Sequence, residues 1–167
     1  MTAAIENKVE ILRGLPDHAR VWIYQSNRPF TEKETLALTS QINGFVQEWT
    51  AHSKQLLAAG GVFYNRFIVL AVDEQMNLAS GCSIDASVYF IQNIENQYDT
   101  QLFDRMTFAY FDSEEVKTAS ATDFARYYTE ESIFDETLVF DNLVKTIGEF
   151  KTDWIKPLKS SWHKRFV

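Results

Sequence analysis

The sequence predicts an α+β fold with a ferredoxin-like β-α-β-β-α-β core and a helical C-terminal extension. Two segments have the apolar spacing of amphipathic helices, one after Thr31 and one after Ser83. Between and around them lie runs that are rich in β-branched and aromatic residues, as is typical of strands. The order of these elements is that of a ferredoxin-like core. The expected strands are residues 20–25, 55–59, 62–73 and 105–111.

The first helix is expected to begin at Thr31. Thr31 and Glu34 have the spacing of a capping box, in which each side chain accepts a hydrogen bond from the other residue's backbone N–H. We expect the helix to end near Ala51, because continuing to the next glycines would exceed the usual ~8–20 residues. His52 would extend the apolar stripe and is expected to be half-buried. The stripe itself consists of Leu38, Ile42, Phe45 and Trp49.

The run Phe67 to Val72 contains six consecutive apolar residues, which predicts a strand with both faces buried. The two helices of a ferredoxin-like core cover only one face of the sheet. The C-terminal helix or a second subunit must therefore cover the other, and we expect the helix to do so. Its apolar residues are Leu143, Ile147, Phe150 and Trp154. The domain prediction is one domain over 1–167, with a core at about 20–112 and the extension at about 113–167 packed on it.

Composition and charge exclude several classes of protein. The 167 residues carry a net charge of −7, which argues against nonspecific nucleic-acid binding. The single cysteine excludes an internal disulfide framework. Residues 1–10 lack the apolar segment of a signal peptide, and no apolar run approaches the ~20 residues of a membrane span. We expect a cytoplasmic protein with no membrane association. Residues 145–167 are basic, and either lie against the acidic body or form an anion-binding tail.

Four short motifs stand out: Val72-Asp73-Glu74, Ser80-Gly81-Cys82-Ser83-Ile84-Asp85, Trp49-x-x-His52 and Ser161-Trp162-His163. Together they resemble a family of small uncharacterised bacterial proteins, over most of the chain from about Arg20. Some members are labelled as ABC transporter ATPases. The resemblance implies no functional residue, because the family has no established activity.

The ATPase label is not supported by the motifs of this chain. A P-loop needs G-x-x-x-x-G-K-[ST], whose backbone amides surround the phosphates while the lysine neutralises them. The only adjacent glycines, Gly60 and Gly61, precede Val62, and no glycine in the chain precedes a lysine. We therefore expect a protein that is not a P-loop ATPase.

Cys82 is the first candidate for chemistry. It lies just before the second helix, whose N-cap is expected at Ser83 or Asp85, and a helix N-terminus can favour a thiolate. A nucleophile would need His52 or His163 to fold close to it as the base. A packed, inert cysteine is the leading interpretation, since free cysteines are among the most buried residues. Contact with a ligand is the third.

The loop around Cys82 has two interpretations. Ser80, Ser83 and Asp85 are good capping and turn residues, so the loop can be purely structural. Loops before helix N-termini also bind anions, and Gly81 would allow close approach of a ligand. Ser80, Gly81, Ser83 and Asp85 are therefore weak ligand-binding candidates.

No cofactor and no metal site are expected. Asp73 and Glu74 follow a buried strand, but adjacent strand residues point to opposite faces, so a solvated turn is the better interpretation. The three histidines lack metal-binding spacing. The leading hypothesis is a noncatalytic binding or protein-interaction module, with a protein partner or a homo-oligomer, because aromatic residues are abundant. The alternative is a small-ligand-binding protein or an enzyme using Cys82; whether the chain is an enzyme is left open.

Overall fold

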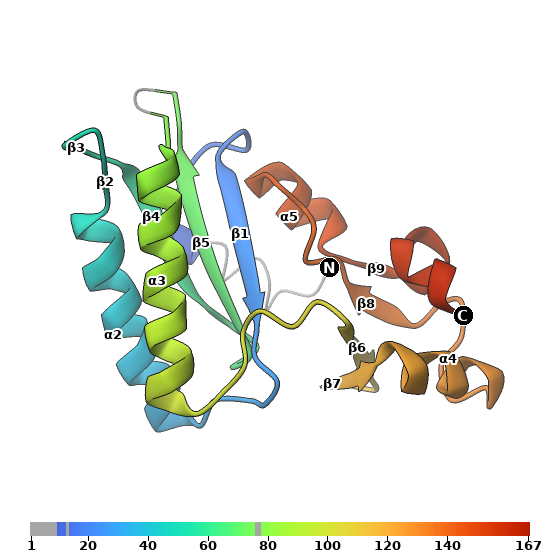
Figure 1. Ribbon diagram of the computed structural model, residues 1–167. Coiled ribbons are helices and arrows are strands. Elements are labelled where there is room, and N and C mark those ends of the chain that lie inside the picture. The colour runs from blue at the N-terminus through green and yellow to red at the C-terminus, as the bar shows by residue number, and fades with distance from the viewer. Residues whose placement is uncertain (1–9, 13, 76–77) are drawn as a thin grey trace.

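The structure is a computed structural model that describes residues 10–12, 14–75 and 78–167, and it confirms the α+β class (Figure 1). All strand pairs are antiparallel. The elements are η1 (Glu10–Leu12), β1 (Arg20–Gln25), α2 (Glu32–Glu48), β2 (Thr50–Ala51), β3 (Lys54–Gln55), β4 (Leu57–Phe63), β5 (Phe67–Asp73), α3 (Gly81–Tyr98), β6 (Thr107–Asp112), β7 (Glu115–Ser120), α4 (Ala121–Thr129), β8 (Leu138–Phe140), α5 (Ile147–Asp153), β9 (Ile155–Pro157), η2 (Leu158–Ser160) and η3 (Trp162–Phe166).

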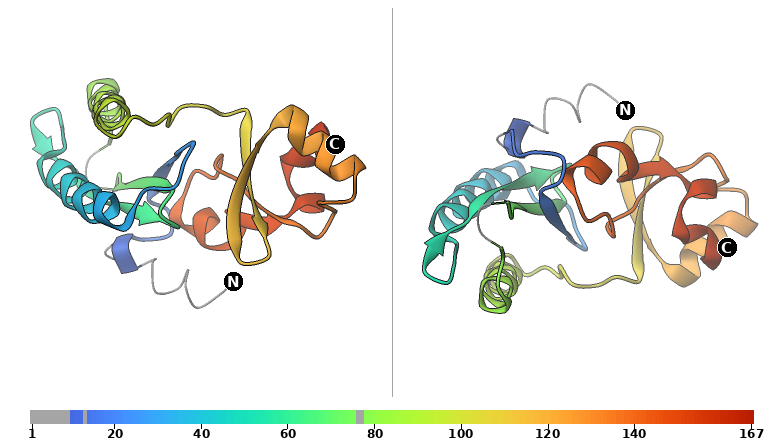
Figure 2. Two further views of the ribbon diagram at one scale, coloured as in Figure 1. Left: turned by 90° about the horizontal axis from the view of Figure 1, so that it is seen from below. Right: turned by 90° about the horizontal axis from the view of Figure 1, so that it is seen from above.

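The first sheet has the order β1-β5-β4, and its central strand is buried on both faces. Because side chains alternate along a strand, β5 contributes to two separate cores. Ile68, Leu70 and Val72 pack with the helices α2 and α3. Phe67, Val69 and Ala71 pack with the C-terminal elements. Both views in Figure 2 place those elements on the opposite side of the sheet from α2 and α3.

The strand expected at 105–111 is β6, and it joins a second sheet of order β7-β6-β8-β9. It pairs with β7 and β8, and not with β1. Residues 145–147 take the neighbouring position at the start of β1. Thr146 forms a bridge with Arg20, and the N–H of Val21 donates to the carbonyl of Lys145. A third core, closed by α4 and η3, lies beneath the second sheet.

The strands expected at 55–59 and 62–73 are instead a hairpin of β4 and β5. The chain reverses at Tyr64 and Asn65, which have φ values of 54° and 53°. Positive φ at two successive residues is typical of tight hairpin turns. The turn was hidden in the sequence because Phe63 and Phe67 continue the apolar pattern on both sides of it.

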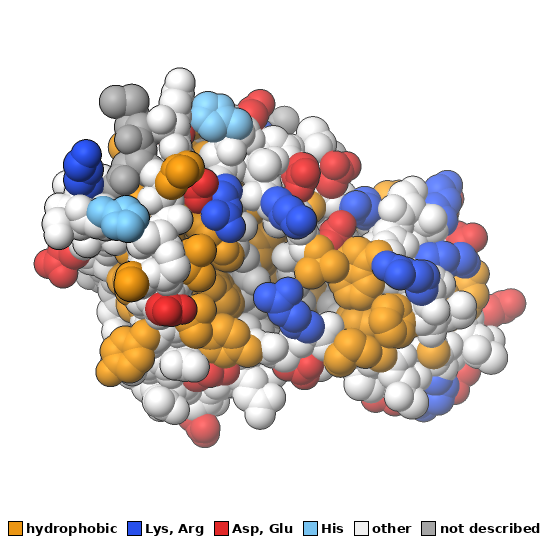
Figure 3. All heavy atoms as spheres, turned by 45° about the horizontal axis from the view of Figure 1, so that its top comes forward, with side chains coloured by type: hydrophobic (Ala, Val, Ile, Leu, Met, Phe, Trp, Pro, Cys, Tyr) orange, Lys and Arg blue, Asp and Glu red, His pale blue; other side chains and the backbone are white. Residues whose placement is uncertain are grey.

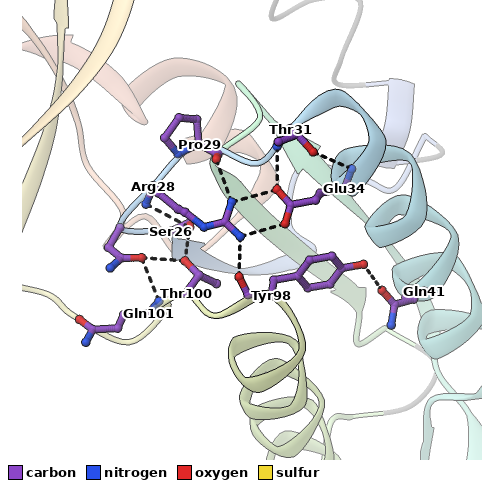
Figure 4. A network of polar contacts seen from close by, with 10 residues as sticks. Ser26, Arg28, Pro29, Thr31, Glu34, Gln41, Tyr98, Thr100 and Gln101 are labelled. Carbon is purple, nitrogen blue, oxygen red and sulfur yellow. Dashed lines mark hydrogen bonds and ion pairs between the residues drawn. The ribbon is translucent and has the colours of Figure 1, made fainter.

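The helix starts are set by side-chain caps. The capping box of Thr31 and Glu34 is confirmed, and α2 ends at Glu48, slightly earlier than expected. The Arg28 guanidinium donates to both oxygens of Glu34 and to the carbonyl of Tyr98, which ties β1, α2 and the end of α3 together (Figure 4). This arginine holds the pKa of Glu34 at about 2. The N-cap of α3 is Ser80, and not Ser83 or Asp85.

The C-terminal segment contacts the first sheet, and its helix is shorter than expected. Helix α5 begins after Thr146, so Leu143 precedes it and is 48% exposed. The ring of Trp154 lies 5.1 Å from that of Phe67 and 5.9 Å from that of Phe63. Basic residues of the segment pair with acidic ones, which agrees with a tail that lies against the acidic body. The pairs are Lys151–Asp17, Lys156–Asp141, Lys159–Glu136 and Lys164–Asp135.

Replacing Trp154 with alanine should destabilise the protein by about 3–5 kcal/mol, since it leaves a cavity between the two sheets. The side chain is fully buried. Urea unfolding measures the loss. Phe134→Ala is the matched control: Phe134 is 58% exposed, and its removal should cost about 0.5 kcal/mol or less. Equal, small losses in both variants would contradict the packing described for α5.

Candidate functional site

A cleft opens along the outer edge of β1, where no strand among the described residues continues the sheet. The backbone contact with residues 145–147 ends at Val21, whose N–H points outward. Ile23, two residues further, presents its N–H and carbonyl on the same edge because these groups alternate along an antiparallel strand. Figure 3 shows hydrophobic side chains gathered between the two halves of the molecule, with lysine and arginine side chains among them.

Two adjoining hollows make up the cleft. The inner one has a volume of about 190 Å³, and it ends against Phe108, Phe140, Trp162 and His163. The outer one, of about 440 Å³, is lined by Arg20, Trp22 and Lys145 among others. The residues common to both hollows are Ile23, Tyr24, Arg105, Asn142 and Leu143. One wall is the connection from α3 to β6, and the other is the segment that follows β8.

A chain of side-chain hydrogen bonds joins the walls at the base of the cleft. Gln25 donates to the carbonyl of Thr107 at 3.0 Å, and its Oε1 accepts from Asn142 Nδ2 at 2.9 Å. Trp154 Nε1 donates to Asn142 Oδ1 at 2.9 Å. The end of β1, the start of β6 and the segment after β8 are therefore held together by amide side chains where backbone pairing is absent.

Two carboxylates fix the walls themselves. Asp141, which is 8% exposed, accepts from the N–H of Leu143 and from Trp162 Nε1 and pairs with Lys156 at 3.0 Å. Asp104 accepts from the N–H of Met106 and from the hydroxyl of Thr107. Both groups hold loops in place, so Asp104 is already engaged although it lines the inner hollow.

The cleft is basic although the chain carries a net charge of −7. Arg20 pairs with Glu74 at 2.9 Å and lies over the ring of Trp22. Within the described part of the chain, Arg105 and Lys145 take part in no ion pair. Two cations without an ion pair thus line the outer hollow, and one of them, Arg105, also lines the apolar inner hollow.

His163 forms part of the inner end of the cleft and is 1% exposed. Its ring stacks on Trp162 at 3.8 Å and meets Phe108 edge-on. Nδ1 lies 2.6 Å from the hydroxyl of Ser161. Of the ring nitrogens, Nε2 has no hydrogen-bond partner among the described residues. Burial lowers the pKa of His163 to about 4, so the ring is neutral at physiological pH.

The structure places Cys82 on the surface, so the expectation of a packed thiol is wrong. Cys82 lies in the first turn of α3. His52 is also exposed and lies in the β2–β3 turn with φ of 53°, and not on the stripe of the first helix. These two elements are at the same end of the first sheet (Figure 1). His163 lies in the C-terminal part, and among the described residues it shares neither hollow with Cys82 or His52.

The polar groups of the loop before α3 form the N-terminal cap of this helix. The Ser80 hydroxyl accepts from the N–H of Ser83, and the Ser83 hydroxyl donates to the carbonyl of Ser80. The carbonyl of Ser83 accepts from Trp49 Nε1. A Cβ at Gly81 would meet nothing within 4 Å, and Asp85 is exposed. These contacts support the structural interpretation of this loop.

The other acidic candidates are engaged by neighbouring groups, and Asp73 is only 8% exposed, so the expected solvated turn is wrong for this residue. Asp73 Oδ1 lies 3.2 Å from His18 Nε2 and accepts from the N–H of Gln75, while Glu74 pairs with Arg20. Asp73 and Glu74 thus have different partners, which agrees with the prediction that they are not a facing pair.

Apart from His163, the residues of the cleft were not among the candidates that the sequence offered. The signal available was Phe103-Asp104-Arg105, an apolar residue followed by two charged ones at the start of the predicted strand 105–111. Phe103 is 39% exposed and contacts Tyr24 edge-on. The cleft itself depends on the position of β6, which the sequence pattern placed in the first sheet.

In comparisons with known proteins, no family model, curated protein or solved structure matches this chain. A search of the described residues for a helix with the length and apolar character of a membrane span found none.

The buried His163 should make stability depend on pH between about 6.5 and about 4. In that range the unfolded chain binds a proton that the folded protein excludes, so the free energy of unfolding falls as the pH falls. The total loss is up to about 3 kcal/mol. Urea unfolding across this range, with His163→Phe as the comparison, measures it. A His163 ring that titrates near pH 6.5 in the folded protein, by NMR, would contradict the assignment.

Cys82 should react with iodoacetamide in the native protein without prior unfolding, because its side chain is exposed. Mass spectrometry of the labelled chain gives the rate with and without urea, relative to a free thiol in each condition. Protection that disappears only in urea would show that the thiol is buried in solution.

Proposed function

We propose that this chain is a noncatalytic binding protein that holds a small, largely apolar ligand in the cleft beside β1. The observation that carries the proposal is the combination of a partly open apolar hollow with a rigid polar base. A cavity of ~150 Å³ accommodates benzene, so the inner hollow of about 190 Å³ has room for a group the size of an aromatic ring.

The apolar lining supports binding because two of its side chains are partly exposed to water. Phe103 and Leu143 are 39% and 48% exposed on opposite walls. A ligand that removes these surfaces from water gains roughly 25 cal/mol for each Å² of apolar area buried. The hydrogen bonds of Gln25 and Asn142 fix the spacing of the two walls, so the hollow is largely formed before binding.

The alternative, an enzyme that uses Cys82 with a histidine, has weaker support. A nucleophile and its base must lie within hydrogen-bond reach in a site that holds a substrate. Cys82 and His52 are both exposed and line neither hollow of the cleft, whereas His163 lies at the inner end of the cleft. The carboxylate of Asp104 is engaged by its own loop. These positions favour binding over catalysis.

The test uses the neutral aromatic probes phenol and benzyl alcohol, titrated into isotope-labelled protein and followed by amide NMR shifts. The shifts should be confined to the two walls and β1. Leu143→Asp should weaken binding about tenfold, because it places a charge in the apolar lining. Leu36→Asp is the matched control, since Leu36 is 71% exposed and lies on α2, outside the lining.

Unchanged binding in Leu143→Asp, or shifts that spread over the surface, would overturn the proposed site. Both variants should keep the amide spectrum of a folded protein, which separates lost binding from lost structure.

A further inference from the structure

This inference rests on the proposed function and concerns the class of ligand. We infer that the cleft binds a small aromatic or short-chain carboxylate, with its apolar body in the inner hollow and its carboxylate at Arg105 and Lys145.

Arg105 stands at the junction of the two hollows and lines both. Its guanidinium has no carboxylate partner in the described part of the chain, although acidic residues outnumber basic ones by 23 to 16. The other cation beside it, Arg20, is already paired with Glu74. A guanidinium offers paired donors that match a carboxylate, so Arg105 is the side chain best suited to the anionic end of a ligand.

The charge of Arg105 reaches the inner hollow as well. Burial raises the pKa of Tyr24, and the nearby positive charge of Arg105 opposes that rise. Tyr24 lines both hollows, next to Ile23. Ile23 lines both hollows together with Arg105, and its N–H faces outward because the N–H of Val21 does.

Lys145 supplies the second free cation, on the opposite wall. Its backbone is fixed, since its carbonyl accepts from Val21 and its N–H donates to Glu149. Its side chain lines the outer hollow and is exposed. The carboxylate of Glu149 accepts from the backbone N–H of Lys145 and forms no ion pair with its ammonium group. The two cations thus face a common space from two walls.

The inner hollow is suited to the apolar body of the ligand. Its end is formed by aromatic rings, and His163 is neutral there. Nε2 of His163 has no hydrogen-bond partner among the described residues, and His163 lines this hollow, so Nε2 is available to one polar group at the far end of the ligand. The volume limits the inner part to about one ring. Asp104, although acidic, is bonded to Met106 and Thr107 and disfavours ligands of high negative charge.

The experiment compares phenylacetate with phenylacetamide, which has the same shape and no charge. Amide NMR titration at low salt gives the affinity of each probe for the full chain. We expect phenylacetate to bind about fivefold or more tightly, and the advantage to shrink as NaCl rises from about 0.01 M to about 1 M. Arg105→Gln should abolish the advantage, and Lys145→Gln should reduce it.

The matched control is Arg165→Gln, which removes the same charge from an exposed residue outside both hollows. It should leave the advantage of phenylacetate unchanged. Equal binding of the two probes at the cleft would overturn the carboxylate assignment and leave the proposed function intact. Binding of neither probe would overturn both. An advantage that Arg165→Gln lowers as much as Arg105→Gln would show a general charge effect and would also overturn the assignment.

Discussion

The burial of β5 on both faces is the constraint on which the rest of the structure depends. A strand in the middle of an antiparallel sheet commonly has one wet face, but all seven residues of β5 are buried. Helices α2 and α3 satisfy one face, so something else must cover the other. Here α5 and the residues around it do so, with Phe150 and Trp154 against the β4–β5 hairpin. The C-terminal part is thereby fixed beside β1, and its position determines which groups can reach the outer edge of that strand.

The cleft follows from this placement. Segment 145–147 reaches the start of β1 on its way to α5, and it occupies the edge as far as Val21. Strand β6 pairs instead with β7 and β8, so no strand of the described part of the chain lies beside Ile23. An open strand edge invites association with other chains. The two walls of the cleft shield the edge of β1. Hydrogen bonds from the amide side chains of Gln25 and Asn142 connect this edge to the walls in place of backbone pairing.

The sequence allowed much of the fold to be predicted where the signals were local. The capping box at Thr31 and the six apolar residues from Phe67 are local patterns, and each forms the structure expected of it. The turn at Tyr64 and Asn65 was missed because it depends on backbone conformation, which two residues with ordinary side chains do not reveal. The partner of β6 was missed because strand pairing is a tertiary choice that local periodicity does not encode.

The site was harder to predict than the fold for the same reason. Arg105, Asn142 and Leu143 come from two connections that are far apart in the chain, and no motif links them. Cys82 was a candidate because a helix N-terminus can activate a cysteine thiol. In the structure Cys82 is exposed on the surface and does not line the cleft, whereas His163 does. Residues with distinctive chemistry are easy to find in a sequence, whereas a hollow made of ordinary side chains needs the packed structure.

Trp154 connects the second core to the cleft through a hydrogen bond, and this links binding to stability. Trp154 packs on Phe67 in the core, and its Nε1 donates to Asn142, which lines the cleft. Asn142 in turn holds Gln25 at the end of β1. A ligand that contacts both walls would favour the arrangement in which these bonds are made, and it would stabilise the folded state in proportion to its affinity. The same tryptophan that covers β5 therefore also sets the shape of the cleft, so that the constraint imposed by the buried strand extends to the binding site.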